Sequence, residues 1–221
     1  MSVLFLIITF TVNAATEGDY IYVVNNGEAT ITGYEGNVYN TLVLIPSQLG
    51  GYPVTGIGAG AFNTTGLSRA TVVIPEGVTT IGDIAFFQAG VDDVQLPESL
   101  KTIGARTFRY CTGLSKINIP ASVTSIGQDS FDSCFNLSEI YITDLKAWCE
   151  IDFDVTDSYY YGANPLSQGG NLYINNVLAE EIVIPKGITE LKKAIFAGYQ
   201  SVKKVEFSEG ITGIGQYAFI D

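Results

Sequence analysis

The sequence predicts a mainly β fold with few short helices, in which short coils stack into a solenoid and their strands form parallel ladders. Two recurring phrases predict it. An apolar residue followed by proline occurs at Ile45-Pro46, Ile74-Pro75, Leu96-Pro97, Ile119-Pro120 and Ile184-Pro185. The second phrase reads IGAGAF from Ile57, IGDIAF from Ile81, IGARTF from Ile103 and IGQDSF from Ile126, with late copies LKKAIF from Leu191 and IGQYAF from Ile214. Phe86, Phe108 and Phe131 are 22 and 23 residues apart, and such a period indicates stacked units, because one unit cannot bury its apolar face alone.

Residues 1–14 are predicted to be a signal peptide. Val3–Val12 is an uncharged apolar run of ten residues, too short for a membrane-spanning helix, which needs about 20. Val12 and Ala14 occupy the −3 and −1 positions of a small-residue cleavage site before Ala15. No Lys or Arg precedes the run, so a buried first strand and an uncleaved anchor stay open as alternatives. The expected location is secreted or cell surface, with no membrane insertion after cleavage.

Residues 15–40 are predicted to form an N-terminal capping hairpin. Tyr20–Val24 and Glu28–Thr32 are short β-prone runs that flank Asn25-Asn26-Gly27. Asn-Gly between two such runs is the strongest short-range signal for a tight primed turn. The first coil of a solenoid needs such a cap, because nothing precedes it to cover its apolar edge.

The unit predicted for the repeats of residues 41–142 can be read from one copy. In Leu114–Pro120, Ile117 and Ile119 point to one side, while the polar residues between them point to the other, which is the pattern of a half-buried strand. Pro120 ends the strand because it cannot donate a ladder hydrogen bond. Gly127 then allows a turn, and Phe131 fills the interior.

The consensus L-x-x-I-x-I-P-x-x-V-T-x-I-G-x-x-A-F-x-x-C resembles the BspA-like leucine-rich repeats, from about Tyr20 to Asp221. The resemblance implies a right-handed, curved stack of the kind found in secreted and surface proteins of bacteria and some protozoan parasites. Relatives of this type are described as adhesins. The family shares a scaffold rather than one activity, so function must be argued from the site.

Residues 143–180 are predicted to be an enlarged repeat or an insertion. Asp144–Glu150 can begin a short helix with Asp144 as its N-cap, and Ile151–Val155 alternates like a strand. Leu172–Ile174 and Val177–Ala179 suggest a second hairpin. Residues 181–221 return to the repeat, and the last one is incomplete. We expect an exposed apolar edge there, through which the chain could self-associate.

Composition excludes several function classes. The 221 residues carry 11 basic and 23 acidic side chains, a formal charge of −12, and no His. An acidic chain is a poor nucleic-acid binder, because phosphates are bound by basic patches. Without His, no Ser-His-Asp, Cys-His or HExxH zinc site can form within the chain. We therefore expect no enzyme activity, no cofactor and no metal.

Two of the three cysteines and one acidic segment have alternative interpretations. Cys111 and Cys134 occupy the same repeat position 23 residues apart, and neighbouring coils lie within disulfide distance, so the sequence allows buried free thiols or a bridge. Asp152, Asp154 and Asp157 fail the spacing of an EF-hand calcium loop, because Thr156 stands where the third acid is needed and Asp157 where the glycine is needed. These acids are expected to form a solvated edge.

Candidate partner-binding residues lie on the outward side of the strands. One outward row contains Val73, Gln95, Asn118, Tyr141, Val183 and Glu206, and the neighbouring row contains Thr71, Asp93, Lys116, Glu139, Glu181 and Lys204. We predict that Gln95, Asn118 and Tyr141 contact a partner, with plain solvent exposure as the alternative. Tyr159, Tyr160 and Tyr161 are further candidates, because tyrosine is enriched at recognition surfaces; packing under the enlarged repeat is the alternative.

Two functions are compatible with these features. The first is a secreted or cell-surface binding module, adhesin-like, that recognises a host or neighbouring-cell protein or glycan at the cell exterior through non-covalent contacts. The alternative is a structural spacer domain of a longer surface protein. A binding module should lose affinity when Tyr141 or the Tyr159–Tyr161 cluster is changed, whereas a spacer should have no partner.

Overall fold

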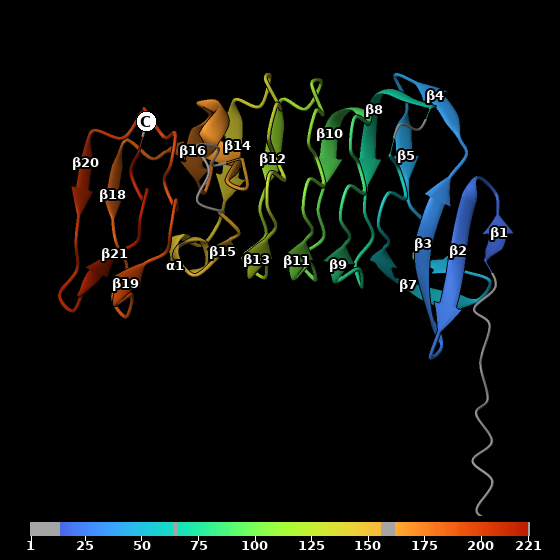
Figure 1. The fold of residues 1–221 in the computed structure, drawn as a ribbon, viewed down its shortest axis with the longest axis horizontal. Coiled ribbons are helices and arrows are strands. Elements are labelled where there is room, and N and C mark those ends of the chain that lie inside the picture. The colour runs from blue at the N-terminus through green and yellow to red at the C-terminus, as the bar shows by residue number, and fades with distance from the viewer. Residues whose placement is uncertain (1–13, 64–65, 156–161, 221) are drawn as a thin grey trace, which may run out of the picture.

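The chain folds as a mainly β solenoid whose coils stack along the long axis of the molecule (Figure 1). This computed structural model describes residues 14–63, 66–155 and 162–220. Residues 1–13 of the expected signal peptide, and the candidates Tyr159, Tyr160 and Tyr161, lie outside the described residues. None of the described helices combines the length and the apolar composition needed to traverse a bilayer.

Two long sheets run along the stack, and most of their pairings are parallel as predicted. Sheet I contains β1 (Ala15–Glu17), β2 (Tyr20–Asn25), β3 (Glu28–Tyr34), β6 (Gln48–Leu49), β7 (Tyr52–Ile57), β9 (Thr80–Ile81), β11 (Thr102–Ile103), β13 (Ser125–Ile126) and β15 (Asp152–Phe153). Sheet II contains β4 (Asn37–Tyr39), β5 (Leu42–Leu44), β8 (Gly66–Val73), β10 (Gly90–Gln95), β12 (Lys116–Asn118), β14 (Glu139–Ile142), β16 (Asn171–Ile174) and β17 (Val177–Leu178). From β7 to β16, each repeat contributes one strand to each sheet, so the core lies between them.

The first strands form the antiparallel hairpin that the Asn-Gly signal predicts. β2 pairs with β3 around a turn in which Asn26 and Gly27 both have positive φ, 52° and 81°. β1 adds to the outer side of β2, and β3 pairs in parallel with β7 of the next coil. The hairpin therefore joins sheet I directly to the repeats.

A file of stacked aromatic rings fills the centre of the solenoid. Phe62, Phe86, Phe108 and Phe131 are each fully buried, and their ring centroids are 4.8, 5.4 and 5.4 Å apart in that order. Tyr34 of the hairpin extends the file, with its ring 5.1 Å from that of Phe62. The last residue of the IGxxAF phrase thus places one ring in each of these coils, within the usual range for aromatic pairs.

The glycine of the same phrase sets how closely the coils approach. A Cβ atom placed on Gly104 would lie 2.5 Å from the backbone nitrogen of Asp83 in the preceding coil. The Gly104 N–H donates to the carbonyl of Ile81 at 2.8 Å. A larger residue would force the coils apart and weaken this hydrogen bond.

Of the two interpretations of the cysteines, the structure shows free thiols. Cys111, Cys134 and Cys149 are all buried and unbridged. The Cys111 and Cys134 thiols donate to the carbonyls of Phe86 and Phe108 in the preceding coils, both at 3.0 Å. Burial raises the pKa of Cys134 to about 12 and that of Cys111 well above its usual value.

Residues 143–180 continue the stack in an enlarged form. α1 (Leu145–Cys149) begins at the predicted N-cap, where Asp144 accepts hydrogen bonds from the backbone of Lys146 and Ala147. β15 extends sheet I, η1 (Pro165–Gln168) follows, and β16 extends sheet II. β16 then turns back through Asn175-Asn176 into β17, forming the second predicted hairpin. The expected strand Ile151–Val155 is shorter than predicted, because only Asp152 and Phe153 pair with β13.

The predicted outward rows are interrupted after β14, although Val183 and Glu206 are exposed as expected. β18 (Glu181–Val183) pairs with β20 (Lys204–Glu206), and β19 (Glu190–Leu191) pairs with β21 (Gly213–Ile214), in two small sheets separate from I and II. Val183 and Glu206 therefore do not continue the row of Gln95, Asn118 and Tyr141. Tyr173 of β16 does, because the β16–β17 hairpin takes the place beside β14.

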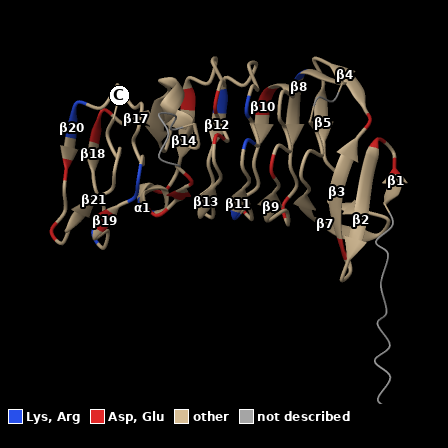
Figure 2. Ribbon diagram, in the orientation of Figure 1, with Lys and Arg blue, Asp and Glu red and all other residues tan. Residues whose placement is uncertain are grey.

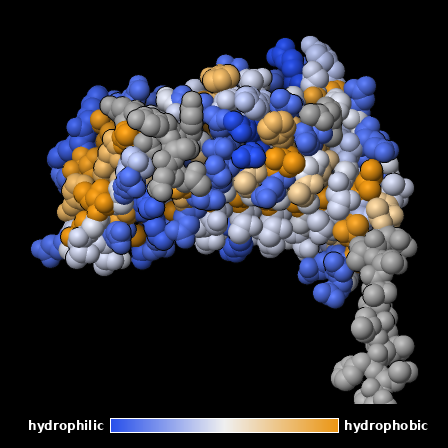
Figure 3. All heavy atoms as spheres, viewed as in Figure 1, coloured by the Kyte–Doolittle hydropathy of each residue, from blue (hydrophilic) through white to orange (hydrophobic). Residues whose placement is uncertain are grey.

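Figure 3 shows hydrophobic residues gathered over these last coils. Val183, Phe207, Ile214 and Phe219 are 36 to 56% exposed. The rest of the visible surface mixes hydrophilic and hydrophobic residues.

Candidate ligand-binding groove

The outward face of sheet II brings three predicted site residues into one row. The register aligns Asp93, Lys116 and Glu139 across β10, β12 and β14, and two residues further along each strand it aligns Gln95, Asn118 and Tyr141. Because neighbouring parallel strands lie about 4.8 Å apart, Gln95 and Tyr141 are separated by roughly 10 Å, with Asn118 between them.

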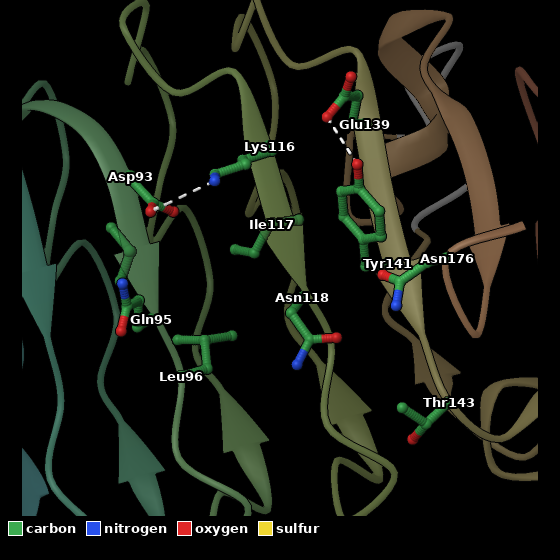
Figure 4. Close-up of a pocket in the computed structure, with 11 residues that line it drawn as sticks. Asp93, Gln95, Leu96, Lys116, Ile117, Asn118, Glu139, Tyr141, Thr143 and Asn176 are labelled. Carbon is green, nitrogen blue, oxygen red and sulfur yellow. Dashed lines mark hydrogen bonds and ion pairs between the residues drawn. The ribbon is translucent and has the colours of Figure 1, made fainter.

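A groove of about 690 Å³ opens over these three strands (Figure 4). Its lining contains Asp93, Val94, Gln95, Leu96, Lys116, Ile117, Asn118, Glu139, Tyr141, Thr143 and Asn176. This volume lies within the range of roughly 300–1,000 Å³ of small-molecule sites. The β16–β17 turn supplies Asn176, so the enlarged repeat forms one wall of the groove.

Charged residues alternate in sign along the neighbouring strands β10, β12 and β14 (Figure 2), in the order Asp93, Lys116 and Glu139. The Lys116 ammonium lies 3.9 Å from the Asp93 carboxylate, and the Tyr141 hydroxyl donates to Glu139 Oε2 at 2.8 Å. The hydrogen bond to Glu139 and the charge of that carboxylate raise the pKa of Tyr141. The protonated hydroxyl therefore donates to the Glu139 carboxylate on the same face of β14.

The amides in the groove are available to a ligand. Within the described part of the chain, the side chains of Gln95, Asn118 and Asn176 form no hydrogen bond. Each amide offers both donors and an acceptor. The two on adjacent strands, Gln95 and Asn118, can contact neighbouring polar groups of one ligand.

Sequence reasoning missed Tyr173, which stacks on Tyr141 with ring centroids 4.9 Å apart and planes 21° apart. The signal was present, because Ile140-Tyr141-Ile142 is echoed by Leu172-Tyr173-Ile174. This equivalence was hidden because no apolar residue followed by proline occurs after Leu172-Tyr173-Ile174 as it does in the regular repeats. The role of Tyr159, Tyr160 and Tyr161 stays a prediction.

A second groove, of about 490 Å³, lies between β15 and the small sheet of β19 and β21. Asp152 and Lys192 face each other there, with Lys192 Nζ 2.6 Å from Asp152 Oδ1. Of the acids weighed for calcium, Asp157 is outside the described residues. In the part of the chain that the structure describes, no three His, Cys, Asp or Glu side chains form a cluster able to hold a metal ion.

Comparisons with known proteins agree with the repeat architecture. Residues 51–152 and 169–221 match the family model described as a BspA type leucine rich repeat region, in six copies. No curated protein matches the chain. A leucine-rich repeat protein of known structure from Bacteroides capillosus is 32% identical, with a TM-score of 0.52, over 59% of this chain and 99% of that one.

Two further solved structures support the fold alone. The leucine-rich repeat protein of T. pallidum is 21% identical, with a TM-score of 0.54, over 92% of this chain and 86% of that one. The pneumococcal vaccine antigen PcpA is 18% identical, with a TM-score of 0.51, over 96% of this chain and 68% of that one. The family match extends over more than half of the residues and includes every IGxxAF phrase, so the chain belongs to the BspA-type leucine-rich repeat family.

Proposed function

We propose that the chain is a secreted or cell-surface binding module that recognises an extracellular protein or glycan through the groove of sheet II. The observation that carries the proposal is the convergence of Gln95, Asn118 and Tyr141 on one open groove. Repeat solenoids commonly use such an extended strand face for partners. An adhesin-like role fits a face that is polar and mixed in charge.

The extracellular setting is supported by two observations. Val3–Val12 has the length and composition of a signal-peptide apolar segment, and one similar structure is that of a vaccine antigen. Expression of the chain in a bacterium with a secretion pathway should release a product that begins at Ala15, as measured by mass spectrometry. An unprocessed chain retained in the cytoplasm would contradict this setting.

The binding role can be tested with a pair of matched variants. Asn118→Tyr fills the groove from its central strand, whereas Val183→Tyr places the same side chain at the equivalent repeat position in the separate sheet of β18 and β20. Both positions are exposed. The chain and both variants are to be probed against extracellular-matrix proteins and a glycan array.

We expect saturable binding that Asn118→Tyr weakens by about tenfold or more, which corresponds to roughly 1.4 kcal/mol. Val183→Tyr should bind as the unchanged chain does. Binding that both variants retain would place the site elsewhere on the molecule. A chain that binds no probe at micromolar concentration would instead be the structural spacer.

A further inference from the structure

We infer that the groove of sheet II takes a short, uncharged oligosaccharide. This inference rests on the proposed function, since it names the ligand class of the same groove. Three features of the groove support it: an aromatic wall, unpaired amides at its centre, and the absence of a free cation among its lining residues.

Tyr141 provides the aromatic wall. Tyr173 covers one face of its ring from the β16 side, so the opposite face is turned toward β12 and the groove (Figure 4). The hydrogen bond to Glu139 holds the ring in this orientation. The face of an aromatic ring carries negative potential, which attracts the weakly positive C–H groups on the flat side of a sugar ring.

The amides of Gln95 and Asn118 match the other side of such a ligand. A sugar hydroxyl is both donor and acceptor, and so is an amide side chain. Their strands are neighbours, about 4.8 Å apart, so the two amides can reach hydroxyls on one sugar ring or on adjacent rings. Asn176 extends this set across the groove from the β16–β17 turn.

The charges of the groove disfavour an acidic sugar. Lys116 lies against Asp93, and the second carboxylate, Glu139, accepts from Tyr141. Two acidic side chains and one basic side chain therefore face the ligand, in a chain whose formal charge is −12. A sialylated or sulfated glycan would bring a further negative charge into this negative field.

The apolar lining disfavours a protein partner. Protein interfaces derive most of their affinity from large apolar anchors that enter desolvated pockets. The aliphatic residues of this groove are already covered by their own coils: Val94 and Ile117 are 1% exposed and Leu96 is 8% exposed. The floor therefore offers polar side chains and one ring face rather than an apolar socket.

The test observes the amides directly. The full chain, labelled with ¹⁵N, is titrated with neutral trisaccharides (cellotriose, maltotriose, mannotriose and triacetylchitotriose) and with sialyllactose as the acidic probe. Loss of a resonance pair in Gln95→Ala or Asn118→Ala identifies each side-chain amide. We expect at least one neutral trisaccharide to shift both amide pairs saturably at millimolar concentration, and sialyllactose to shift them at least about tenfold more weakly.

Three variants then test the wall. Tyr141→Ala should weaken the neutral trisaccharide by about tenfold, whereas Tyr141→Phe keeps the ring and should weaken it by no more than about threefold. Tyr52→Ala, at an exposed tyrosine of β7 outside the groove, should change nothing. If Tyr141→Ala alters the backbone spectrum, two other variants decide whether the groove binds the sugar. Tyr141→Phe should retain affinity for the neutral trisaccharide, and Asn118→Ala should lower it.

The outcomes separate this inference from the proposed function. If no neutral trisaccharide shifts the amides while Asn118→Tyr abolishes binding to a matrix protein, the groove recognises proteins: the sugar inference falls and the proposed function stands. Preferential binding of sialyllactose would also overturn the inference. If no probe of either class is affected by Asn118→Tyr, both proposals fall.

Discussion

The junctions between coils are built in two different ways. In the regular stack, backbone hydrogen bonds cross every junction, as in Phe86 N–H to Thr107 O and Phe108 N–H to Ser130 O, at 2.9 and 2.8 Å. After the enlarged repeat, the described strands β15 and β16 form no ladder with β18 or β19 (Figure 1). At this one junction, side-chain hydrogen bonds therefore replace the backbone ladder that joins the regular coils.

Three buried side chains connect the coils at this second junction. Asn164 Nδ2 donates to the carbonyls of Ala194 and Ile195, at 2.7 and 3.0 Å. Trp148 Nε1 donates to the same Ile195 carbonyl at 3.1 Å, and the Tyr199 hydroxyl donates to the Ala179 carbonyl at 2.8 Å. Stacking can therefore continue where the repeat fails, provided that side chains satisfy the carbonyls left by the missing ladder.

Removal of a ring from the regular stack should be the most destabilising change. Phe108→Ala should lower the free energy of unfolding by about 3–5 kcal/mol, because it leaves a cavity between two buried rings. Urea unfolding measures this loss. Phe135→Ala, at a side chain that is 74% exposed, should cost far less. Equal losses in the two variants would contradict the role given to the stacked rings.

The second prediction concerns the junction itself. Asn164→Ala should lower the free energy of unfolding by about 1–3 kcal/mol. The reason is that the buried Ala194 carbonyl loses its side-chain donor, and the Ile195 carbonyl keeps only that of Trp148. Asn136→Ala is the matched comparison, since Asn136 Nδ2 also donates to a carbonyl, that of Thr112 at 2.6 Å, but at an exposed site where water can replace it. Hydrogen exchange should rise in residues 181–220 of the Asn164 variant more than in residues 66–131. A uniform rise along the chain would show that the two junctions are equivalent.

The buried thiols make stability depend on alkaline pH. Burial raises the pKa of Cys134 and of Cys149 to about 12, from 9.0. The folded chain therefore binds more protons than the unfolded chain between about pH 9 and 12, and stability falls as pH rises through that window. Each thiol contributes at most about 1.4 kcal/mol per pH unit.

Urea unfolding at several alkaline pH values measures this slope. Cys134→Ala, in the regular stack, and Cys149→Ala, at the second junction, should each make the slope shallower. If Cys149 titrates closer to its ordinary pKa than Cys134 does, only the Cys134 variant will change the profile. That result would show that the second junction admits water.

Loss of the ion pair across the second junction should matter least. Lys192 and Asp152 are 44% and 70% exposed in their side chains, and such pairs contribute about 0–1 kcal/mol. Lys192→Ala should therefore change the free energy of unfolding by less than about 1 kcal/mol, and less still at high salt. A loss comparable to that of Asn164→Ala would mean that charge, rather than the buried amide, joins the coils.

The parts of the fold that follow the repeat could be predicted from the sequence. The IGxxAF phrase located the stacked phenylalanines, the Asn-Gly pair located the first hairpin, and Asp144 located the start of α1. Each of these depends on local chemistry. Gln95, Asn118 and Tyr141 could be aligned because their strands lie one period apart.

The rest could not be predicted, because it depends on where the period is lost. Extrapolation of the repeat period predicts Val183 beside Tyr141. In the structure, the hairpin of β16 and β17 places Tyr173 there instead. Nothing in the repeat indicated that Trp148 and Asn164 would meet the backbone of residues 194 and 195. Such contacts join residues 30 or more positions apart, without a pattern that marks them.

The second junction also gives the molecule a mechanical property. Hydrogen bonds between coils point along the solenoid axis, so a pull along that axis loads them directly. A junction without a backbone ladder will yield first under tension. We expect a single-molecule pulling experiment to extend residues 181–220 in a separate early step, while the strands that carry the groove stay folded. The groove of sheet II would then keep its shape while these last coils extend.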